Sequence, residues 1–295
     1  MKHSLLLLLA FAMPSLALAT PALVDARWLA QNLENDQVLI VDLRPRNVYE
    51  YGHIKNSTNT DVNLWRMPGK KKLQSMLPQK SHLQKLMSQI GATPEHHIVL
   101  VAGDSAGELA TATRVYWTMD QLGHEKKSIL DGSIMEYARL RLPVERGAND
   151  RPATDYRITN LKTDQITGDD INANKNLNII DARSKAEFLG IYQGAPDERA
   201  GTIPGAQSLP YDWFTINGRG TFNSKENLET LMQTVSLDDK KPTVVFCHTG
   251  MRASLSWFVL HEILGNKDTV LYDASTLEWA KRKDLPMHQA VGIKH

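Results

Sequence analysis

The sequence predicts an α/β protein that contains two copies of one domain in tandem, each with a mostly parallel sheet flanked by helices. The chain has 295 residues, about twice the usual size of a single domain. Five landmarks recur in the same order about 140 residues apart. Within each copy, short strands rich in β-branched residues alternate with helical patterns, which is typical of parallel sheets with helical crossovers.

The overall composition excludes several classes of protein. Hydrophobic residues make up 42% and charged residues 23% of the chain, which is ordinary for a globular protein and excludes a disordered or collagen-like chain. Lys plus Arg total 34 against 33 Asp plus Glu, so the charge gives no reason to expect nucleic acid as a partner. With one cysteine, Cys247, neither an intramolecular disulfide nor a multi-cysteine metal site can form. The ten histidines show no metal-ligand spacing.

Residues 1–19 have the features of a secretory signal peptide. A short basic start is followed by the apolar run Leu5–Met13, and Ala17-Leu18-Ala19 supplies the small-x-small pattern that a signal peptidase accepts. The run is too short for a comfortable membrane span, so we expect cleavage after Ala19 and no membrane attachment afterwards. Export, to the periplasm, would place the protein in an oxidising compartment, where a lone cysteine is unexpected unless its thiol is used.

The first repeated element is a buried strand that ends in Asp-x-Arg. It occurs as Val38–Arg44 and again as Leu177–Arg183, and both copies are β-branched-rich runs typical of parallel strands. A helix start follows each of them, at Asn47–Tyr51 and at Lys185–Phe188. A glycine-containing turn comes next in both copies.

The second repeated element is a strand, a glycine-containing turn and a helix. The strands are His97–Ala102 and Pro242–Phe246. Aligning the glycines of the two turns pairs Asp104 with Cys247, and Glu108-Leu109 with Met251-Arg252. The last landmarks, around Asp131 and Asp273, complete the repeat.

These landmarks set the predicted domain boundaries. The signal peptide covers 1–19 and a first domain covers 20–146. The stretch that follows is rich in turn formers and poor in apolar residues, so we place a linker at 147–158. The second domain then covers 159–295.

Cys247 stands where a thiol would be reactive. It lies between an apolar strand and the amphipathic helix Ala253–Ile263, so its sulfur is expected above a helix N-terminus, where free N–H groups favour an anion. Such a position stabilises a thiolate and makes it a nucleophile at neutral pH. Gly250 lets successive N–H groups point inward, and Arg252 adds a fixed positive charge. The alternative is a buried structural cysteine.

Taken in order, these motifs resemble those of tandem rhodanese domains, and the chain resembles an exported thiosulfate sulfurtransferase. Leu177–Arg183 with Gly201–Ala206 is similar to the N-terminal signature of that family, Cys247–Arg252 to its active-site loop and Asp273–Trp279 to its C-terminal signature. The resemblance implies that Cys247 takes the outer sulfur of thiosulfate or another sulfane donor as a persulfide and passes it to cyanide or a thiol. It implies no metal and no organic cofactor. The substrate would be bound by loop residues and two arginines, namely His248, Thr249, Gly250, Met251, Arg252 and Arg183.

The first copy departs from this pattern at the loop. Asp104 in place of the cysteine cannot carry sulfur, so the first domain is expected to be catalytically inactive. In the family the second domain often has a further substrate-binding arginine, and Glu187 falls near that position here. Arg183 or Arg199 is a candidate to replace it, and a structural ion pair of Arg183 with Asp181 or Glu187 is the alternative. For His248 we expect a solvent-facing position on the loop, because a thiolate formed by the loop needs no base; a general base is the alternative.

Two other functions fit the same residues. One is a cysteine phosphatase or arsenate reductase on the same fold, and the other is a persulfide carrier or binding module without its own turnover. The loop length argues against phosphate, because phosphatases that resemble this fold use Cys-x5-Arg whereas only four residues separate Cys247 from Arg252. The arginine favours thiosulfate over mercaptopyruvate as the donor.

Overall fold

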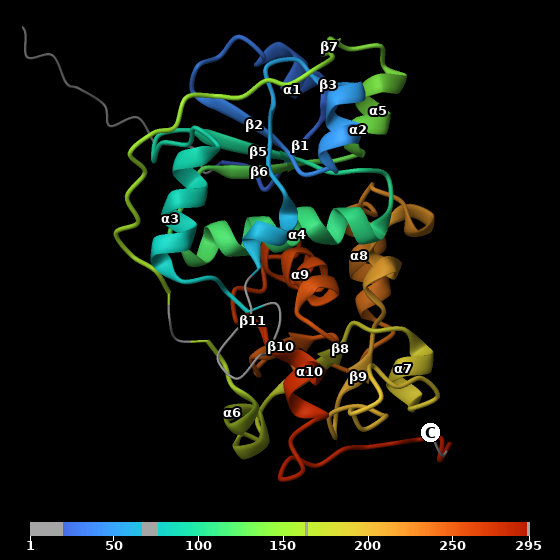
Figure 1. The fold of residues 1–295 in the computed structure, drawn as a ribbon. Coiled ribbons are helices and arrows are strands. Elements are labelled where there is room, and N and C mark those ends of the chain that lie inside the picture. Colours follow the sequence, from blue (N-terminus) through green and yellow to red (C-terminus); the bar gives the residue numbers. More distant parts are fainter. Residues whose placement is uncertain (1–19, 67–75, 163–164, 294–295) are drawn as a thin grey trace, which may run out of the picture.

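In the computed structural model the chain folds into two α/β lobes of similar build, one above the other in Figure 1. The structure describes residues 20–66, 76–162 and 165–293. The predicted signal peptide, residues 1–19, lies outside the described residues. None of the helices within the described ranges is long and apolar enough to cross a membrane.

The first lobe is built on a five-stranded parallel sheet with the strand order β1-β6-β5-β2-β4. Helices α1, α2 and α5 lie on its outer side, and α3 and α4 lie on the side that faces the second lobe (Figure 1). A short antiparallel pair, β3 with β7, forms a separate two-stranded sheet. The elements are β1 Leu23–Val24, α1 Ala26–Gln31, β2 Val38–Asp42, α2 Arg46–Tyr51, β3 His53–Ile54, β4 Thr58–Asn59, the 3₁₀ helix η1 Val62–Trp65, α3 Lys80–Gln89, β5 His97–Val101, α4 Ala106–Gln121, β6 Lys127–Leu130, α5 Ser133–Arg139 and β7 Val144–Glu145.

The second lobe repeats the plan with a four-stranded parallel sheet, in the order β11-β10-β8-β9. Its elements are α6 Gly168–Ala173, β8 Asn178–Asp181, α7 Lys185–Leu189, β9 Gln207–Ser208, the 3₁₀ helices η3 Tyr211–Phe214 and η4 Ile216–Gly218, α8 Lys225–Met232, β10 Thr243–Phe246, α9 Met251–Phe258, the π-helix η5 Val259–Ile263, β11 Thr269–Leu271 and α10 Ser275–Trp279. The predicted α/β class with two parallel sheets is therefore confirmed.

The two central strands of each sheet follow directly from the sequence pattern. All residues of β2 are buried, as a strand covered by helices on both faces requires. Each Asp-x-Arg motif closes on itself at the carboxyl end of its strand: Arg44 binds Asp42, and Arg183 binds Asp181 in the same way. The helix after Cys247 begins at Met251, two residues before the predicted start, and its last turn is the π-helix η5.

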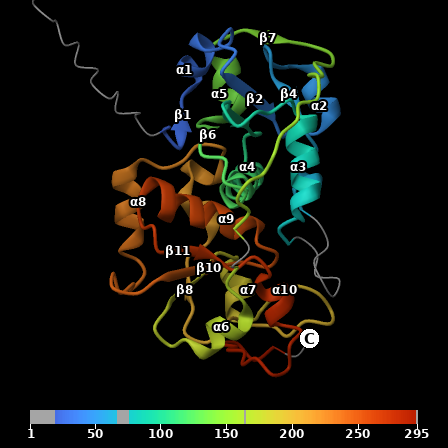
Figure 2. The same cartoon turned by 90° about the vertical axis from the view of Figure 1, so that its left-hand side faces the viewer.

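The lobes pack through α4 and α9, the helices that follow the two loops. These helices lie against each other in both views (Figures 1 and 2). Their contact is buried: the Tyr116 and Phe258 rings meet edge to face at 4.9 Å, and the Thr113 and Ser254 hydroxyls are 2.9 Å apart. One hydrophobic core cluster contains buried residues of both lobes. The loop ahead of each helix is thereby held at the boundary between the lobes.

Candidate active site

Cys247 is buried at the carboxyl end of β10 and opens the loop that leads into α9. Ser275 fastens this loop from the neighbouring turn. The Ser275 Oγ accepts hydrogen bonds from the backbone N–H groups of Cys247 at 3.1 Å and Gly250 at 3.2 Å, and it donates to the Tyr272 carbonyl at 2.8 Å. The Cys247 carbonyl accepts from the N–H of Thr276 at 3.2 Å and from its hydroxyl at 3.0 Å. The cysteine backbone is therefore fixed on both sides.

Four backbone N–H groups around the cysteine are available to bind a ligand. Those of His248, Thr249, Met251 and Arg252 have no hydrogen-bond partner among the residues that the structure describes. They belong to the loop and to the first turn of α9, where N–H groups lack intrahelical acceptors and the helix dipole favours negative charge. The loop can therefore hold an anion at or beside the Cys247 sulfur. The side chain of Met251 takes no part in this, because it packs against the hydrophobic core.

Gly250 makes the curl of the loop possible. It adopts a left-handed conformation with φ of +73° directly before α9, as the sequence analysis expected for this glycine. The space beside it is also closed: a Cβ atom there would lie 2.6 Å from Oδ1 and 2.7 Å from the carbonyl oxygen of Asp273. Both the backbone angle and the close approach therefore require glycine.

Arg252 lies next to the loop but is already paired. Its two terminal nitrogens donate to the Glu187 carboxylate at 2.7 Å and 2.8 Å, and both side chains are largely buried. The arginine hydrogen bonds and charge hold the pKa of Glu187 at about 2, against the opposing effect of burial. Glu187 therefore stays ionised at neutral pH and neutralises the charge that the sequence analysis assigned to substrate.

His248 is not the solvent-facing residue that we expected. Its Nε2 lies 3.0 Å from the carboxylate of Glu198, whose side chain is 1% exposed, and the ring itself is about three-quarters buried. Glu198 also lies 3.9 Å from the Lys281 ammonium. The prediction was wrong because Glu198, 50 positions away in the chain, contacts the ring, and no spacing in the sequence indicated that contact.

The other two candidate arginines do not reach the loop. Arg183 is buried against Asp181, with nitrogen–oxygen distances from 2.6 to 3.2 Å, and it donates to the Gly201 carbonyl at 2.7 Å. Arg199 donates to four backbone carbonyls, those of Trp279, Ala280, Arg282 and Leu285. Both geometries favour a structural role. For Arg183 the partner is Asp181, one of the two carboxylates considered in the sequence analysis.

Arg66, a residue of the first lobe that the sequence analysis did not single out, contacts the loop instead. It follows η1, and its Nη2 donates to the Thr249 hydroxyl at 3.1 Å and to the Thr249 carbonyl at 3.3 Å. Its side chain lies close enough for its charge and that of Cys247 to interact favourably. This contact joins residues 183 positions apart, so no local pattern could have indicated it.

A second contact from the first lobe lies beneath the loop. Arg114 of α4 forms a buried ion pair with Asp273, and the backbone N–H of Leu77 donates to the same carboxylate at 2.8 Å. Asp273 is the residue that closes the space beside Gly250. The first lobe therefore supports the loop from below through Asp273 and contacts it at Thr249.

The same contacts occur in reverse on the first lobe. Arg219 of the second lobe pairs with Asp104, and the Phe222 N–H donates to the Asp131 carboxylate at 3.0 Å. Asp131 occupies the place in the first lobe that Asp273 has in the second. Each lobe thus sends one segment across the boundary to brace the loop of the other, in an approximate two-fold arrangement.

The strand register corrects the predicted alignment of the two loops. Asp42 pairs with Val101, and Asp181 pairs with Phe246, so Ala102 and not Asp104 corresponds to Cys247. Asp104 then corresponds to Thr249, and Ala106-Gly107 corresponds to Met251-Arg252.

The alignment was wrong because it paired two glycines that serve different purposes. Gly107 lies inside α4, whereas Gly250 is the left-handed residue before α9. In the first lobe the equivalent residue, Ser105, is extended and caps the helix with its side chain, which accepts from the Glu108 N–H at 3.2 Å. The first loop therefore needs no glycine, and it has neither a thiol nor an arginine at the two key positions.

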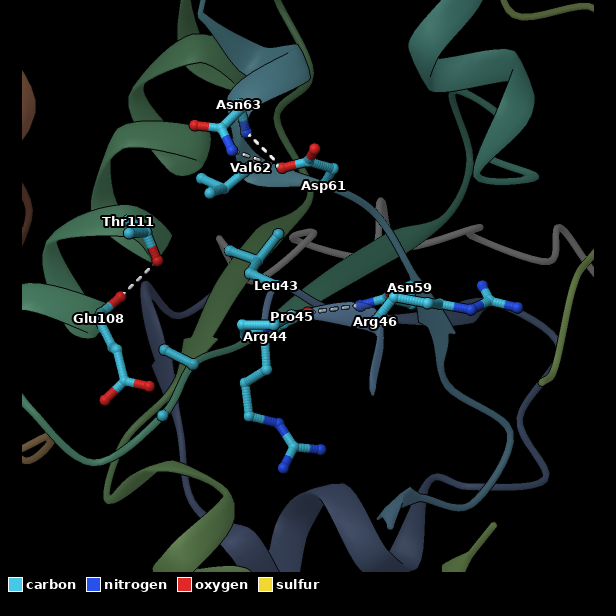
Figure 3. A pocket seen from close by; sticks show the side chains of 12 residues that line it. Leu43, Arg44, Pro45, Arg46, Asn59, Asp61, Val62, Asn63, Glu108 and Thr111 are labelled. Carbon is cyan, nitrogen blue, oxygen red and sulfur yellow. Dashed lines mark hydrogen bonds between the residues drawn. The ribbon is translucent and has the colours of Figure 1, made fainter. Parts of the chain in front are cut away.

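A cavity of about 500 Å³ lies at this corresponding position of the first lobe (Figure 3). The loop after β2, the segment around η1 and the start of α4 line it, with carboxylates and guanidinium groups both present. The lining residues are Leu43, Arg44, Pro45, Arg46, Asn59, Asp61, Val62, Asn63, Ala102, Gly103, Glu108 and Thr111. Within the described part of the chain, no group of three or more His, Cys, Asp or Glu residues is arranged to hold a metal ion.

Comparisons with known proteins agree with this architecture. A family model described as "Rhodanese-like domain" matches residues 25–140 and again residues 167–282. The chain is 32% identical over 274 residues to a "Putative thiosulfate sulfurtransferase" of Mycobacterium tuberculosis (strain ATCC 25618 / H37Rv), covering 90% of this chain and 96% of that relative. It is 28% identical over 284 residues to the "3-mercaptopyruvate sulfurtransferase" of Escherichia coli (strain K12), covering 92% and 99%.

Solved structures lead to the same group of proteins. The crystal structure of SseA from Escherichia coli, described under the heading of 3-mercaptopyruvate sulfotransferases, superimposes with a TM-score of 0.76 at 26% identity and covers 87% of this chain and 99% of SseA. The Tum1 protein of Saccharomyces cerevisiae superimposes with a TM-score of 0.77 at 21% identity, covering 92% and 98%. At that identity the second match speaks for the fold alone.

Proposed function

Because this chain belongs to the rhodanese-like family and is a sulfurtransferase, we propose that it takes a sulfane sulfur from thiosulfate and carries it on Cys247. The observation that carries this proposal is the loop of unpartnered N–H groups that surrounds a fixed, buried cysteine at the start of α9. Such a loop stabilises an anionic sulfur in the protein interior without a metal or an organic cofactor.

In the first step the Cys247 thiolate attacks the outer sulfur of thiosulfate. A bond forms between the two sulfur atoms while the sulfur–sulfur bond of thiosulfate breaks, and its electron pair leaves with sulfite. The product is the Cys247 persulfide anion, so the total charge of reactants and products is equal. The N–H groups of His248, Thr249, Met251 and Arg252 would hold the terminal sulfur, and the positive end of the α9 dipole favours its charge.

In the second step an acceptor takes the outer sulfur and restores the thiolate. Cyanide attacks the terminal sulfur and leaves as thiocyanate, while the bonding electron pair returns to Cys247. A thiolate acceptor reacts in the same way and leaves as a persulfide.

The choice of thiosulfate over 3-mercaptopyruvate rests on charge. Thiosulfate is a dianion, and two arginine side chains, Arg252 and Arg66, lie near enough for their charges to interact with that of Cys247. A relative named as a putative thiosulfate sulfurtransferase supports the same choice, whereas the Escherichia coli relative is named for 3-mercaptopyruvate. We assign no transfer step to the first domain, because Ala102 occupies the position of the cysteine there.

One set of measurements tests the proposal. The wild-type protein should form thiocyanate from thiosulfate and cyanide, and after thiosulfate alone its intact mass should rise by about 32 Da, the mass of one sulfur. Cys247→Ser should lose both. A variant that still gains the mass or turns over would show that another group carries the sulfur. Persulfide formation without turnover would instead favour the carrier function, and phosphatase activity that depends on Cys247 would favour the phosphatase.

Export to the periplasm belongs to the proposal as well, and it is supported by the pattern of residues 1–19. Expression with the native leader should yield a mature protein in the periplasmic fraction whose N-terminal residue is Thr20. Full-length protein retained in the cytoplasm would contradict export.

A further inference from the structure

The arginines beside Cys247 differ in whether a carboxylate neutralises them. Arg252 is paired with Glu187, and Arg114 is paired with Asp273. Arg66 has no ion-pair partner within the described ranges, although its side chain is partly buried and contacts Thr249 of the other lobe. Among the residues that the structure describes, its buried Nε has no hydrogen-bond partner, and its Nη2 donates to the hydroxyl and the carbonyl of Thr249.

A partly buried guanidinium without a carboxylate partner lowers the stability of the folded protein, because its charge has lost part of its hydration. Burial and the neighbouring Arg114 both lower the pKa of Arg66, whereas the charges of Cys247 and Asp273 raise it. Arginine nevertheless stays protonated in proteins, so the positive charge persists, and no carboxylate of the described residues pairs with it directly. The backbone holds the residue in place: its N–H donates to the Asn63 carbonyl at 3.3 Å, and the preceding Trp65 is fully buried.

We propose that Arg66 determines donor specificity by providing, from the first lobe, the positive charge that recognises a doubly charged sulfur donor beside Cys247. This inference rests on the proposed function, because it takes Cys247 as the sulfur carrier. It assigns the catalytically inactive lobe a direct part in substrate recognition. Arg252, whose charge Glu187 already balances, would then mainly support the loop.

The test compares two donors that deliver the same sulfur but differ by one charge. With thiosulfate, the Cys247 thiolate takes the outer sulfur and releases sulfite, a dianion. With methanethiosulfonate, a monoanion, the same attack releases methanesulfinate. The rate of Cys247 persulfide formation is measured with each donor by rapid quenching and intact mass, over a range of ionic strength.

For Arg66→Met we expect the rate constant at low donor concentration to fall at least tenfold more with thiosulfate than with methanethiosulfonate, and to lose part of its salt dependence. Arg66→Lys should restore part of the preference, because it keeps the charge without the planar fork. The matched control is Arg219→Met, which removes the corresponding arginine contact on the other loop and should leave the ratio of the two donors unchanged.

The ratio separates recognition from stability, because both donors are measured on one preparation. An unchanged ratio in Arg66→Met, or equal changes in Arg66→Met and Arg219→Met, would overturn the inference while leaving the sulfur chemistry of Cys247 intact. If Arg66→Met does not fold, the wild-type protein decides: a thiosulfate rate constant that depends on ionic strength no more strongly than the methanethiosulfonate rate constant would overturn the inference. A wild-type protein that gains no sulfur from either donor would contradict the proposed function itself.

Discussion

The ion pair between Glu187 and Arg252 makes a pH-dependent contribution to stability that can be calculated. Glu187→Gln removes the charge but keeps a side chain that can accept from Arg252 and from Ser184. In the folded protein the pKa of Glu187 is about 2, against an ordinary value of 4.5. At about 1.4 kcal/mol per pH unit, this difference corresponds to about 3 kcal/mol of folding free energy.

The sign follows from which state binds the proton more readily. The unfolded chain takes up the proton at a higher pH than the folded one, so the contribution is fully present above about pH 4.5 and is lost as the pH falls to about 2. The free energy of unfolding of Glu187→Gln should therefore be about 3 kcal/mol below that of wild type at pH 7. The two proteins should converge as the pH approaches 2.

Urea unfolding of both proteins at several pH values between 7 and 2.5 measures this difference. The matched control is Glu34→Gln, which removes an equally short but exposed ion pair with Lys55 and should change the stability little at any pH. A difference between Glu187→Gln and wild type that stays constant over the whole range would refute the reasoning. It would mean that the charge of Glu187 contributes nothing beyond its hydrogen bonds.

Three further predictions concern the loop. Arg252→Ala should reduce thiosulfate turnover by about 10²–10³-fold, the usual scale for one misplaced charge beside an anionic site, because it leaves the Glu187 carboxylate unpaired next to the loop; turnover rates equal to those of wild type would contradict this reasoning. Asp104→Ala should leave turnover within a few-fold of wild type, because the contacts that it removes, with Arg219 and Ser133, do not involve Cys247; a severe kinetic loss with normal folding would place the first loop in the chemistry. Gly250→Ala should lower the free energy of unfolding by about 1–3 kcal/mol, because alanine is strained in the left-handed conformation, and urea unfolding measures this loss. The collision of the new Cβ with Asp273 should also impair persulfide formation, which mass spectrometry measures. A wild-type result in both measurements would contradict the strain argument.

The parts of the site that depend on local order in the chain were predictable from the sequence. The strand β10, the loop after it and the left-handed Gly250 follow from an apolar run, a cysteine, a glycine and an amphipathic helix. The partners of the loop were not predictable in this way. Glu198 and Arg66 reach it from segments about 50 and 183 positions away, and only the packing of the lobes brings them there.

The misaligned repeat has a related cause. Two glycines in similar turns invite alignment, but they are equivalent only if their backbone conformations match. Gly107 is helical, inside α4, whereas Gly250 is left-handed. Hydrogen bonding between strands gives the more reliable guide. The carbonyl of Ala102, directly after β5, accepts from the Ile134 N–H, and the carbonyl of Cys247, directly after β10, accepts from the Thr276 N–H. Both donors follow the next strand of their own sheet, so these bonds pair Ala102 with Cys247.

The crossed segments between the lobes bear on the order of events during biosynthesis. A ribosome makes the chain from its N-terminus, and domains generally fold as units in that order. The lobe that carries Arg66, Leu77 and Arg114 is therefore synthesised before the strand β10 that leads to Cys247. The loop of the second lobe gains its contacts with these residues only when the two lobes dock. The site around the thiol is therefore completed only when the lobes dock. Before docking, the loop lacks the Arg66 contact at Thr249 and the ion pair of Arg114 with Asp273.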